Sequence, residues 1–244
     1  MREITIQRRF TEAPAGSVLW KQGKTIILCT ASVNRDVPPW FRDDRAGGWV
    51  TADYVMLPGS TPQRKDWPRI GHTDSRGTEI QRLIGRSVRA MLDLSKIGPN
   101  TIHVDCHVLQ ADGGTRTASI CAAAVALADA LDRLPREMPA PEGPITPSND
   151  PKLYDPSRAL ADELAAVSVG IVDGEIRLDL DYQDDSRAEV DMNVAWTAGG
   201  KFVEIQGSAE NGGGFDAQQM QKMTGLAVSG CRQLLTRMRA ARAG

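Results

Sequence analysis

Seven of the fourteen prolines in the chain fall between Pro135 and Pro156. Proline fixes φ and has no N–H to donate, so this density excludes both a helix and a central strand. Residues 135–159 are therefore predicted to be a connector or a loop with a role of its own. The connector divides the chain into two parts, residues 1–134 and 160–244.

The first part contains strands followed by helices. Residues 25–33 and 49–56 are short apolar runs typical of buried strands. From Thr78 to Leu94 the apolar residues recur every three or four positions, which predicts an amphipathic helix. Residues 101–109 are predicted to form a strand, and residues 115–134 a long alanine-rich helix.

The second part has a similar order of elements. Asp173-Gly174 is a strong two-residue hairpin signal, and residues 198–200 indicate a second hairpin. The flanking strands and the last helix are predicted at residues 167–172, 175–182, 192–196, 201–205 and 216–238. Strands followed by helices, twice, predict an α+β fold with duplicated βαβ-type units.

Charge is unevenly distributed along the chain. The formal net charge is only −2, which does not by itself indicate a nucleic-acid binder. Residues 63–89 carry seven Arg or Lys, whereas residues 173–191 carry six Asp and two Glu against two Arg. The two regions suit an anionic substrate and a divalent cation, or they are two solvated faces.

The cysteines and apolar runs bear on the compartment. The four cysteines are far apart and form no CxxC pair, which favours reduced thiols over disulfides or a zinc site. The first residues lack the apolar core of a signal peptide, and no apolar run approaches the roughly 20 residues that span a bilayer. We therefore expect a cytoplasmic protein without a membrane partner.

A glycine pair joins the strand at 101–109 to the helix at 115–134, in the order Asp112-Gly-Gly-Thr-Arg116. Glycine allows close approach of a ligand to the backbone, and the first N–H groups of a helix are unpaired. The helix dipole adds partial positive charge, so this turn could hold an oxyanion such as phosphate. Arg116 could grip that anion in a bidentate way. The alternative is an ordinary strand–helix turn with Thr115 near the cap.

Other arginines precede and line the predicted helix from Thr78. Arg76 could reach the same anion or pair with Glu79. Arg82, Arg86 and Arg89 share one face, which is either a solvated or subunit-facing surface or a contact for RNA phosphates. RNA contacts of this kind are strongly dependent on salt.

The acidic run from Asp181 to Asn193 contains two carboxylates six residues apart, Asp185 and Asp191, on either side of a turn-like segment. Such carboxylates can converge on one Mg²⁺ ion, which usually takes one or two of them plus water and substrate oxygens. Asp184 and Glu189 are further candidates. The alternative is an acidic solvated loop.

Eight segments, in order along the chain, resemble the ribonuclease PH family. They are CTASV (29–33), GWVTADY (48–54), MLPGST (56–61), RGTEIQRLIGRSVRA (76–90), VLQADGGTRTASI (108–120), AAVSVGIVDGE (165–175), DYQDDSRAEVDMN (181–193) and VEIQGSAE (203–210). The QADGGTRTAS segment and the nearby DMN element are together highly specific for that family.

The resemblance implies a single phosphorolytic exoribonuclease domain, with the duplicated fold related to the second domain of ribosomal protein S5. It implies a homohexameric ring built as a trimer of dimers. Members trim the 3′ ends of tRNA precursors, and can act on ribosomal RNA ends, using inorganic phosphate and releasing nucleoside 5′-diphosphates. The reaction is reversible, so members are also nucleotidyltransferases.

The resemblance also implies roles for particular residues. Phosphate would be held by Arg76 and by Gly114, Thr115 and Arg116. Asp185 and Asp191 match the acidic pair assigned to Mg²⁺, and with Arg76 and Arg116 they form the predicted catalytic set. The predicted RNA contacts are Arg64, Arg69, Arg82 and Arg86.

The chain departs from the family in its RNA-gripping segments. The family's N-terminal RPxGR segment is missing, and Gly59 stands where members often carry Arg, although Arg64 is kept. The alternatives are a general RNA-degrading phosphorylase, an inactive RNA-binding or ring-scaffold subunit, and a hydrolytic nuclease that releases monophosphates. Retention of the carboxylate pair and the glycine turn argues against the scaffold.

Overall fold

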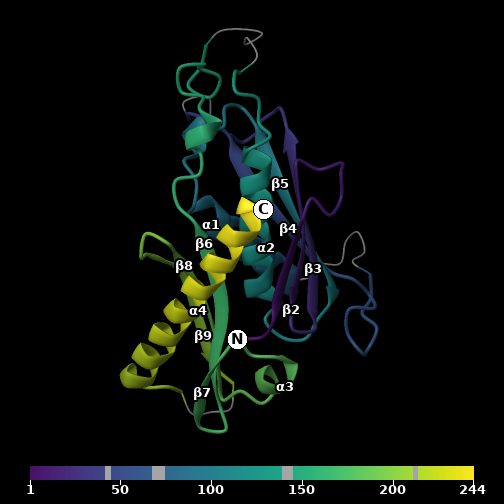
Figure 1. The fold of residues 1–244 in the computed structure, drawn as a ribbon, viewed down its shortest axis with the longest axis vertical. Helices are drawn as coiled ribbons and strands as arrows, with labels where there is room; N and C mark the ends of the chain where they lie inside the picture. Colours follow the sequence, from purple (N-terminus) through teal and green to yellow (C-terminus); the bar gives the residue numbers. More distant parts are fainter. Residues whose placement is uncertain (42–44, 68–74, 139–144, 211–213) are drawn as a thin grey trace.

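The computed structural model describes residues 1–41, 45–67, 75–138, 145–210 and 214–244. The chain forms two sheets with helices between and beside them (Figure 1). The elements of the first part are β1 (Ile4–Arg8), β2 (Gly16–Gln22), β3 (Thr25–Asn34), β4 (Trp49–Met56), α1 (Ser75–Arg89), β5 (Thr101–Gln110) and α2 (Thr115–Leu131). Those of the second part are β6 (Leu164–Val172), β7 (Glu175–Leu178), α3 (Tyr182–Asp185), β8 (Val190–Thr197), β9 (Phe202–Ala209) and α4 (Ala217–Ala243).

The first sheet has the order β1-β2-β3-β5-β4. Strands β4 and β5 are parallel and are connected through α1, which makes a βαβ unit; the other neighbours are antiparallel. Strand β5 ends at Gln110, directly before the glycine turn that leads into α2. The sheet therefore places this turn beside the end of β4.

The second sheet has the order β7-β6-β8-β9, with every pair antiparallel. Asp173 (φ 52°) and Gly174 (φ 75°) both adopt the positive φ that a two-residue hairpin of type I′ requires, so the predicted hairpin is confirmed. Helix α3 lies in the connection from β7 to β8. The parallel crossover thus belongs to the first part, while the second part is wholly antiparallel, with β8 beside β6 and not beside β7.

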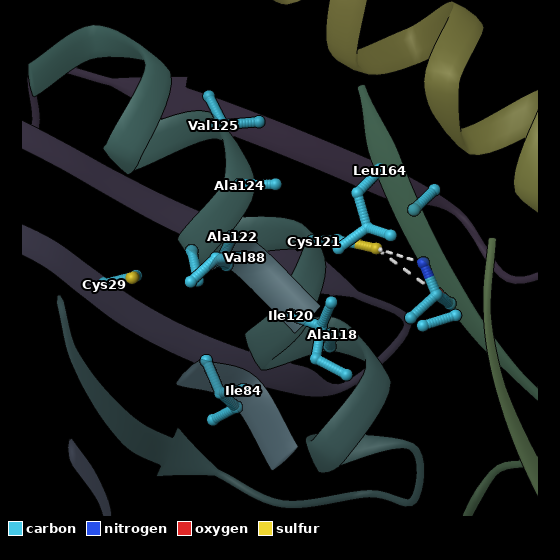
Figure 2. Close-up of a cluster of buried hydrophobic side chains, with 14 of the residues drawn as sticks. Cys29, Ile84, Val88, Ala118, Ile120, Cys121, Ala122, Ala124, Val125 and Leu164 are labelled. Atoms are coloured by element: carbon cyan, nitrogen blue, oxygen red, sulfur yellow. Dashed lines mark hydrogen bonds between the residues drawn. The ribbon is translucent and has the colours of Figure 1, made fainter. Parts of the chain in front are cut away.

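Helix α2 is the centre of the core. It is buried on all sides between the two sheets, as a helix that is apolar all round should be. Figure 2 shows Ala118, Ile120, Ala122 and Ala124 of this helix within a cluster of buried apolar side chains, and Cys121 next to strand β6. The Cys121 thiol lies 3.2 Å from both the N and the O of Ala166. Buried residues of both parts form one continuous hydrophobic cluster.

The predicted α+β class and most predicted elements are confirmed, but several bounds were wrong. Helix α1 begins at Ser75 and ends at Arg89, because Asp93 caps a separate 3₁₀ turn, Leu94–Lys96. Strand β7 ends at Leu178, because Asp179 has a positive φ of 62° that a strand does not tolerate.

The proline-rich connector has no α-helix or strand in its described residues, as predicted; it ends in a 3₁₀ turn, Pro156–Arg158. Across the parts of the chain that the structure describes, no helix has the length and apolar character needed to cross a membrane.

Candidate functional site

One cavity of about 540 Å³ lies where the two parts of the chain meet. The first part contributes the end of β4, the loop after it, the start of α1 and the glycine turn. The second part contributes β6, α3 and β8. Seven of the residues singled out from the sequence line this cavity together: Arg64, Arg76, Gly114, Thr115, Arg116, Asp185 and Asp191.

The glycine turn presents the uncapped N-terminus of α2 to the cavity. Gly113 (φ 73°) and Gly114 (φ 63°) both occupy the left-handed region, and Gly114 is the N-cap without a side chain to bond the first helical N–H groups. A Cβ on Gly113 would lie 2.5 Å from the carbonyl carbon of Asp181, so only glycine fits against the acidic segment. Free N–H groups and the helix dipole together attract an anion.

Two arginines flank this anion-binding turn. Arg76 lies in the first turn of α1 and Arg116 in the first turn of α2, and neither turn contains an acidic residue. Among the described residues Glu79 pairs with Arg116 at 3.5 Å and not with Arg76, so the Arg76–Glu79 pair considered from the sequence is not formed. The Nε of Arg116 is buried without a hydrogen-bond partner among the described residues, so this guanidinium can still donate to an anion.

Asp185 and Asp191 line the same cavity and belong to the second part of the chain. Asp185 ends α3, and Asp191 is the second residue of β8. Burial raises the pKa of Asp185, which the nearby Arg76 and Arg116 partly oppose. Burial and the charge of Asp185 raise the pKa of Asp191 to about 6, against the opposing effect of Arg116. Two partly buried carboxylates that repel each other are the electrostatic setting in which a divalent cation is held.

Asp184 and Glu189, the further candidates from the sequence, have partners of their own. Asp184 forms ion pairs with Arg177 at 2.7 Å and Arg187 at 3.5 Å, and Glu189 accepts from the N–H of Gly174. In the described chain no group of three or more His, Cys, Asp or Glu could hold a metal ion. A cation on Asp185 and Asp191 would therefore take its other ligands from water and phosphate oxygens, as Mg²⁺ commonly does.

The predicted RNA-binding arginines do not form one group. Arg64 lines the cavity and its side chain is 69% exposed, with a distant contact to Asp66 at 3.8 Å. Arg82 and Arg86 line a separate hollow of about 340 Å³ that also includes Trp49 and Arg89. Arg86 pairs there with Glu204 at 3.3 Å. Arg69 lies outside the described residues.

Sequence reasoning missed several residues of the site. Tyr54 on β4 donates a hydrogen bond to Thr115 at the turn. Tyr182, at the start of α3, lines the cavity and is 60% exposed, and Asn193 donates to Asp191 at 3.4 Å. Arg2 donates to the carbonyl of Asp112, directly before the turn, and forms an ion pair with Asp179. Tyr54 could have been suspected as a site residue from the sequence, because its strand and the strand before the glycine turn are both apolar. No local sequence pattern shows, however, that these two strands pair.

Comparison with known proteins identifies the family. Residues 1–131 match domain 1 of the 3′ exoribonuclease family, and residues 162–230 match domain 2. The chain belongs to the ribonuclease PH family of 3′ exoribonucleases. The family and enzyme class predicted from the sequence are thereby confirmed.

Two relatives and one solved structure illustrate the similarity. The chain is 49% identical to a ribonuclease PH of Rhodopirellula baltica, over 96% of this chain and 90% of that one. It is 50% identical to a ribonuclease PH of a Mycobacterium species (strain KMS), over 99% of this chain and 87% of that one. The Archaeoglobus fulgidus exosome with RNA bound to the active site shares the fold, with a TM-score of 0.73 and 21% identity over 97% of this chain and 88% of that one.

Proposed function

We propose that the chain shortens RNA from the 3′ end by phosphorolysis, with tRNA precursors as its main substrate and ribosomal RNA ends as a further one. One observation carries the proposal: the uncapped N-terminus of α2, with Arg76 and Arg116, opens into the same cavity as Asp185 and Asp191. An anion and a cation held in one cavity are what phosphoryl transfer requires.

Inorganic phosphate is the co-substrate and the nucleophile. It is held by Arg76, by the Arg116 side chain and by the backbone N–H groups around Gly114 and Thr115. A phosphate oxygen attacks the phosphorus of the last phosphodiester, and the bond to the 3′ oxygen of the preceding nucleotide breaks. That oxygen takes up a proton, and a nucleoside 5′-diphosphate leaves. Because a phosphodiester is exchanged for a phosphoanhydride, the reaction also runs in reverse when diphosphates are plentiful.

Asp185 and Asp191 are the proposed ligands of Mg²⁺. The bound ion would offset negative charge on the phosphoryl group during transfer. Burial raises the pKa of both carboxyl groups, and the charge of Asp185 raises that of Asp191 further. This supports the assignment, because a bound cation would stabilise the ionised forms that burial disfavours. Arg76 and Arg116, the proposed phosphate ligands, lie close enough to oppose the rise in the pKa of Asp185.

RNA is proposed to contact Arg64 at the cavity, and Arg69, Arg82 and Arg86 beyond it. The chain is proposed to work as one domain, with residues 1–134 and 160–244 as its two parts, because both contribute to one core and one cavity. We further propose a homohexameric ring, a trimer of dimers, in the cytoplasm. Four free, buried cysteines suit a reducing compartment.

The test is product analysis with a tRNA precursor that carries extra 3′ nucleotides. The protein is incubated with Mg²⁺, with and without phosphate, and the released nucleotides are identified. Diphosphates that appear only with phosphate are expected. Monophosphates released regardless of phosphate would mean hydrolysis, and RNA binding without any release would favour a scaffold; either result contradicts the proposal.

A further inference from the structure

Arg2 and Asp179 form a nearly buried ion pair between distant parts of the chain. The Arg2 guanidinium donates to Oδ1 of Asp179 from Nη2 at 2.6 Å and from Nε at 3.1 Å. The backbone N–H of Arg2 donates to Oδ2 of the same carboxylate at 2.7 Å. The side chain of Asp179 is 1% exposed and that of Arg2 is 15% exposed. Such a charge-assisted, multiply bonded pair holds its partners in one geometry.

The pair extends to both walls of the cavity. The remaining terminal nitrogen of Arg2 donates to the carbonyl of Asp112 at 2.6 Å, directly before the glycine turn. A Cβ on Gly114 would lie only 2.8 Å from Nη2 of Arg2, so the guanidinium lies directly against the turn. Asp179, for its part, begins the segment that leads through α3 to Asp185.

Asp179 is itself fixed by its surroundings. The amide of Gln22 donates to its Oδ1 at 2.6 Å, and its own N–H donates to the carbonyl of Ser168 at 2.7 Å. Its φ of 62° is uncommon for a residue with a side chain and persists only where neighbouring contacts impose it. The ion pair therefore helps to hold this backbone turn. Loss of the ion pair would release the turn and move the segment that carries Asp185.

We propose that Arg2 and Asp179 are positioning residues that clamp the phosphate-binding turn to the carboxylate segment and so set the distance between bound phosphate and the metal ligands. Neither side chain lines the cavity, and Arg2 contacts the glycine turn through the Asp112 carbonyl. This inference rests on the proposed phosphorolytic function. The inference adds to that function the residues that keep the phosphate-binding turn and the metal ligands at a fixed separation.

The consequence is a selective loss of phosphate use. Loosening the clamp frees the glycine turn to move against Asp185, and misplacement of this kind can cost up to about a hundredfold in rate. Arg64, the proposed RNA contact at the cavity, lies on the loop after β4 and not on the segments that Arg2 and Asp179 join. Affinity for RNA in the absence of phosphate should therefore be unchanged.

The chain offers a matched control pair. Arg8 donates to both carboxylate oxygens of Asp129, at 2.8–3.1 Å, and also to the carbonyls of Ala241 and Arg242. The exposed fractions of the Arg8 and Asp129 side chains, 15% and 7%, resemble those of the clamp. The control joins β1, α2 and α4 and does not line the cavity. Variants of the Arg8–Asp129 pair therefore show how the loss of an equivalent ion pair lowers the melting temperature when the cavity is not involved.

The experiment compares Arg2→Lys and Asp179→Asn with Arg8→Lys and Asp129→Asn in the full chain. Arg2→Lys keeps the charge but loses the planar fork, so it is the milder change. For each protein we would measure the melting temperature, KM and kcat for inorganic phosphate, the melting-temperature shift caused by phosphate alone, and RNA affinity by fluorescence anisotropy without phosphate.

Both clamp variants are expected to raise KM for phosphate about tenfold or more and to lose the stabilisation by phosphate, with RNA affinity within about twofold of wild type. The control variants are expected to lower the melting temperature without changing KM. If Asp179→Asn fails to fold, Arg2→Lys decides alone. Unchanged phosphate KM in the clamp variants, or an equal rise in the controls, overturns the clamp. Absence of phosphorolysis in the wild type would instead overturn the proposed function.

Discussion

The hydroxyl of Tyr54 donates a 3.0 Å hydrogen bond to Oγ1 of Thr115, the first residue of α2. Tyr54 lies on β4 and is 5% exposed, and burial raises the pKa of its hydroxyl, so it remains protonated and a donor. With its oxygen accepting from Tyr54, the hydroxyl hydrogen of Thr115 is free to point at an anion in the cavity. The parallel pairing of β4 with β5 is what brings the two residues together.

We predict that Tyr54→Phe raises KM for phosphate about three- to tenfold and leaves RNA affinity unchanged, because one orienting hydrogen bond contributes about 1 kcal/mol. Steady-state kinetics with phosphate as the varied substrate measure the effect. Tyr154→Phe is the matched control, since its hydroxyl donates to the carbonyl of Pro135, far from the turn. Equal KM values in wild type and Tyr54→Phe would contradict the predicted role.

Arg116 should be required in both directions of the reaction. Its buried Nε has no hydrogen-bond partner among the described residues, and its place in the first turn of α2 suits it to bind an anion there. We predict that Arg116→Ala lowers kcat about 10²–10³-fold for phosphorolysis and for polymerisation from diphosphates alike. Arg239→Ala, which removes an exposed ion pair with Glu163, should change neither rate. Full retention of either activity in Arg116→Ala would remove its proposed role.

Asp191 should make the protein less stable at neutral pH. Its pKa is about 6 in the folded chain against an ordinary value of 3.8, so the folded state holds this proton more tightly than the unfolded state. The cost of ionisation is fully present above pH 6 and disappears as pH falls from about 6 toward 4. Asp191→Asn should therefore raise the free energy of unfolding by roughly 1–3 kcal/mol at pH 7.5.

Urea denaturation without divalent cations, at pH 7.5 and at pH 4, measures this gain and its expected disappearance. The exposed Asp53 supplies the control, because Asp53→Asn should change stability by less than about 0.5 kcal/mol at either pH. Destabilisation by Asp191→Asn at pH 7.5 would show that the carboxylate is already compensated in the folded chain.

Site residues that lie close together in the sequence could be predicted, whereas contacts between residues far apart in the sequence could not. The turn at Gly113-Gly114 and the carboxylates six residues apart are local signals, and the structure places both at one cavity. The Tyr54–Thr115 and Arg2–Asp179 contacts join residues separated by 61 and 177 positions, so no local pattern reveals them.

Element bounds show the same limit. Strand alternation alone would continue β7 to Tyr182, but the left-handed turn at Asp179 exists because Arg2, Gln22 and Ser168 hold it. The stripe of Arg82 and Arg86 followed from helical spacing, yet that spacing could not show that the stripe faces a hollow apart from the phosphate turn.

Metal affinity should depend on pH through the same carboxylate. A cation binds the ionised form of Asp191, and protons compete for it below pH 6. We predict that the Mg²⁺ concentration giving half-maximal activity rises about tenfold between pH 7 and pH 5. Magnesium titrations at several pH values test this, with intrinsic fluorescence as a control for folding. A half-maximal concentration independent of pH would argue against Asp191 as a ligand.

Arg64 should contact RNA directly. Arg64 is exposed at the cavity, so Arg64→Ala should weaken RNA binding and lower the slope of log affinity against log salt by about one. Fluorescence anisotropy at several salt concentrations measures the effect. An unchanged slope would argue against a contact between Arg64 and RNA phosphate.

Arg86 should contribute less to RNA binding than Arg64, because its guanidinium already pairs with Glu204 beside the second hollow. Arg86→Ala should lower the salt slope by less than about one and leave the fraction of protein that sediments at six times the 26.4 kDa chain mass unchanged. Anisotropy and analytical ultracentrifugation measure the two quantities. If Arg86→Ala dispersed the hexamer with an unchanged salt slope, the α1 face would contact a neighbouring subunit and not RNA.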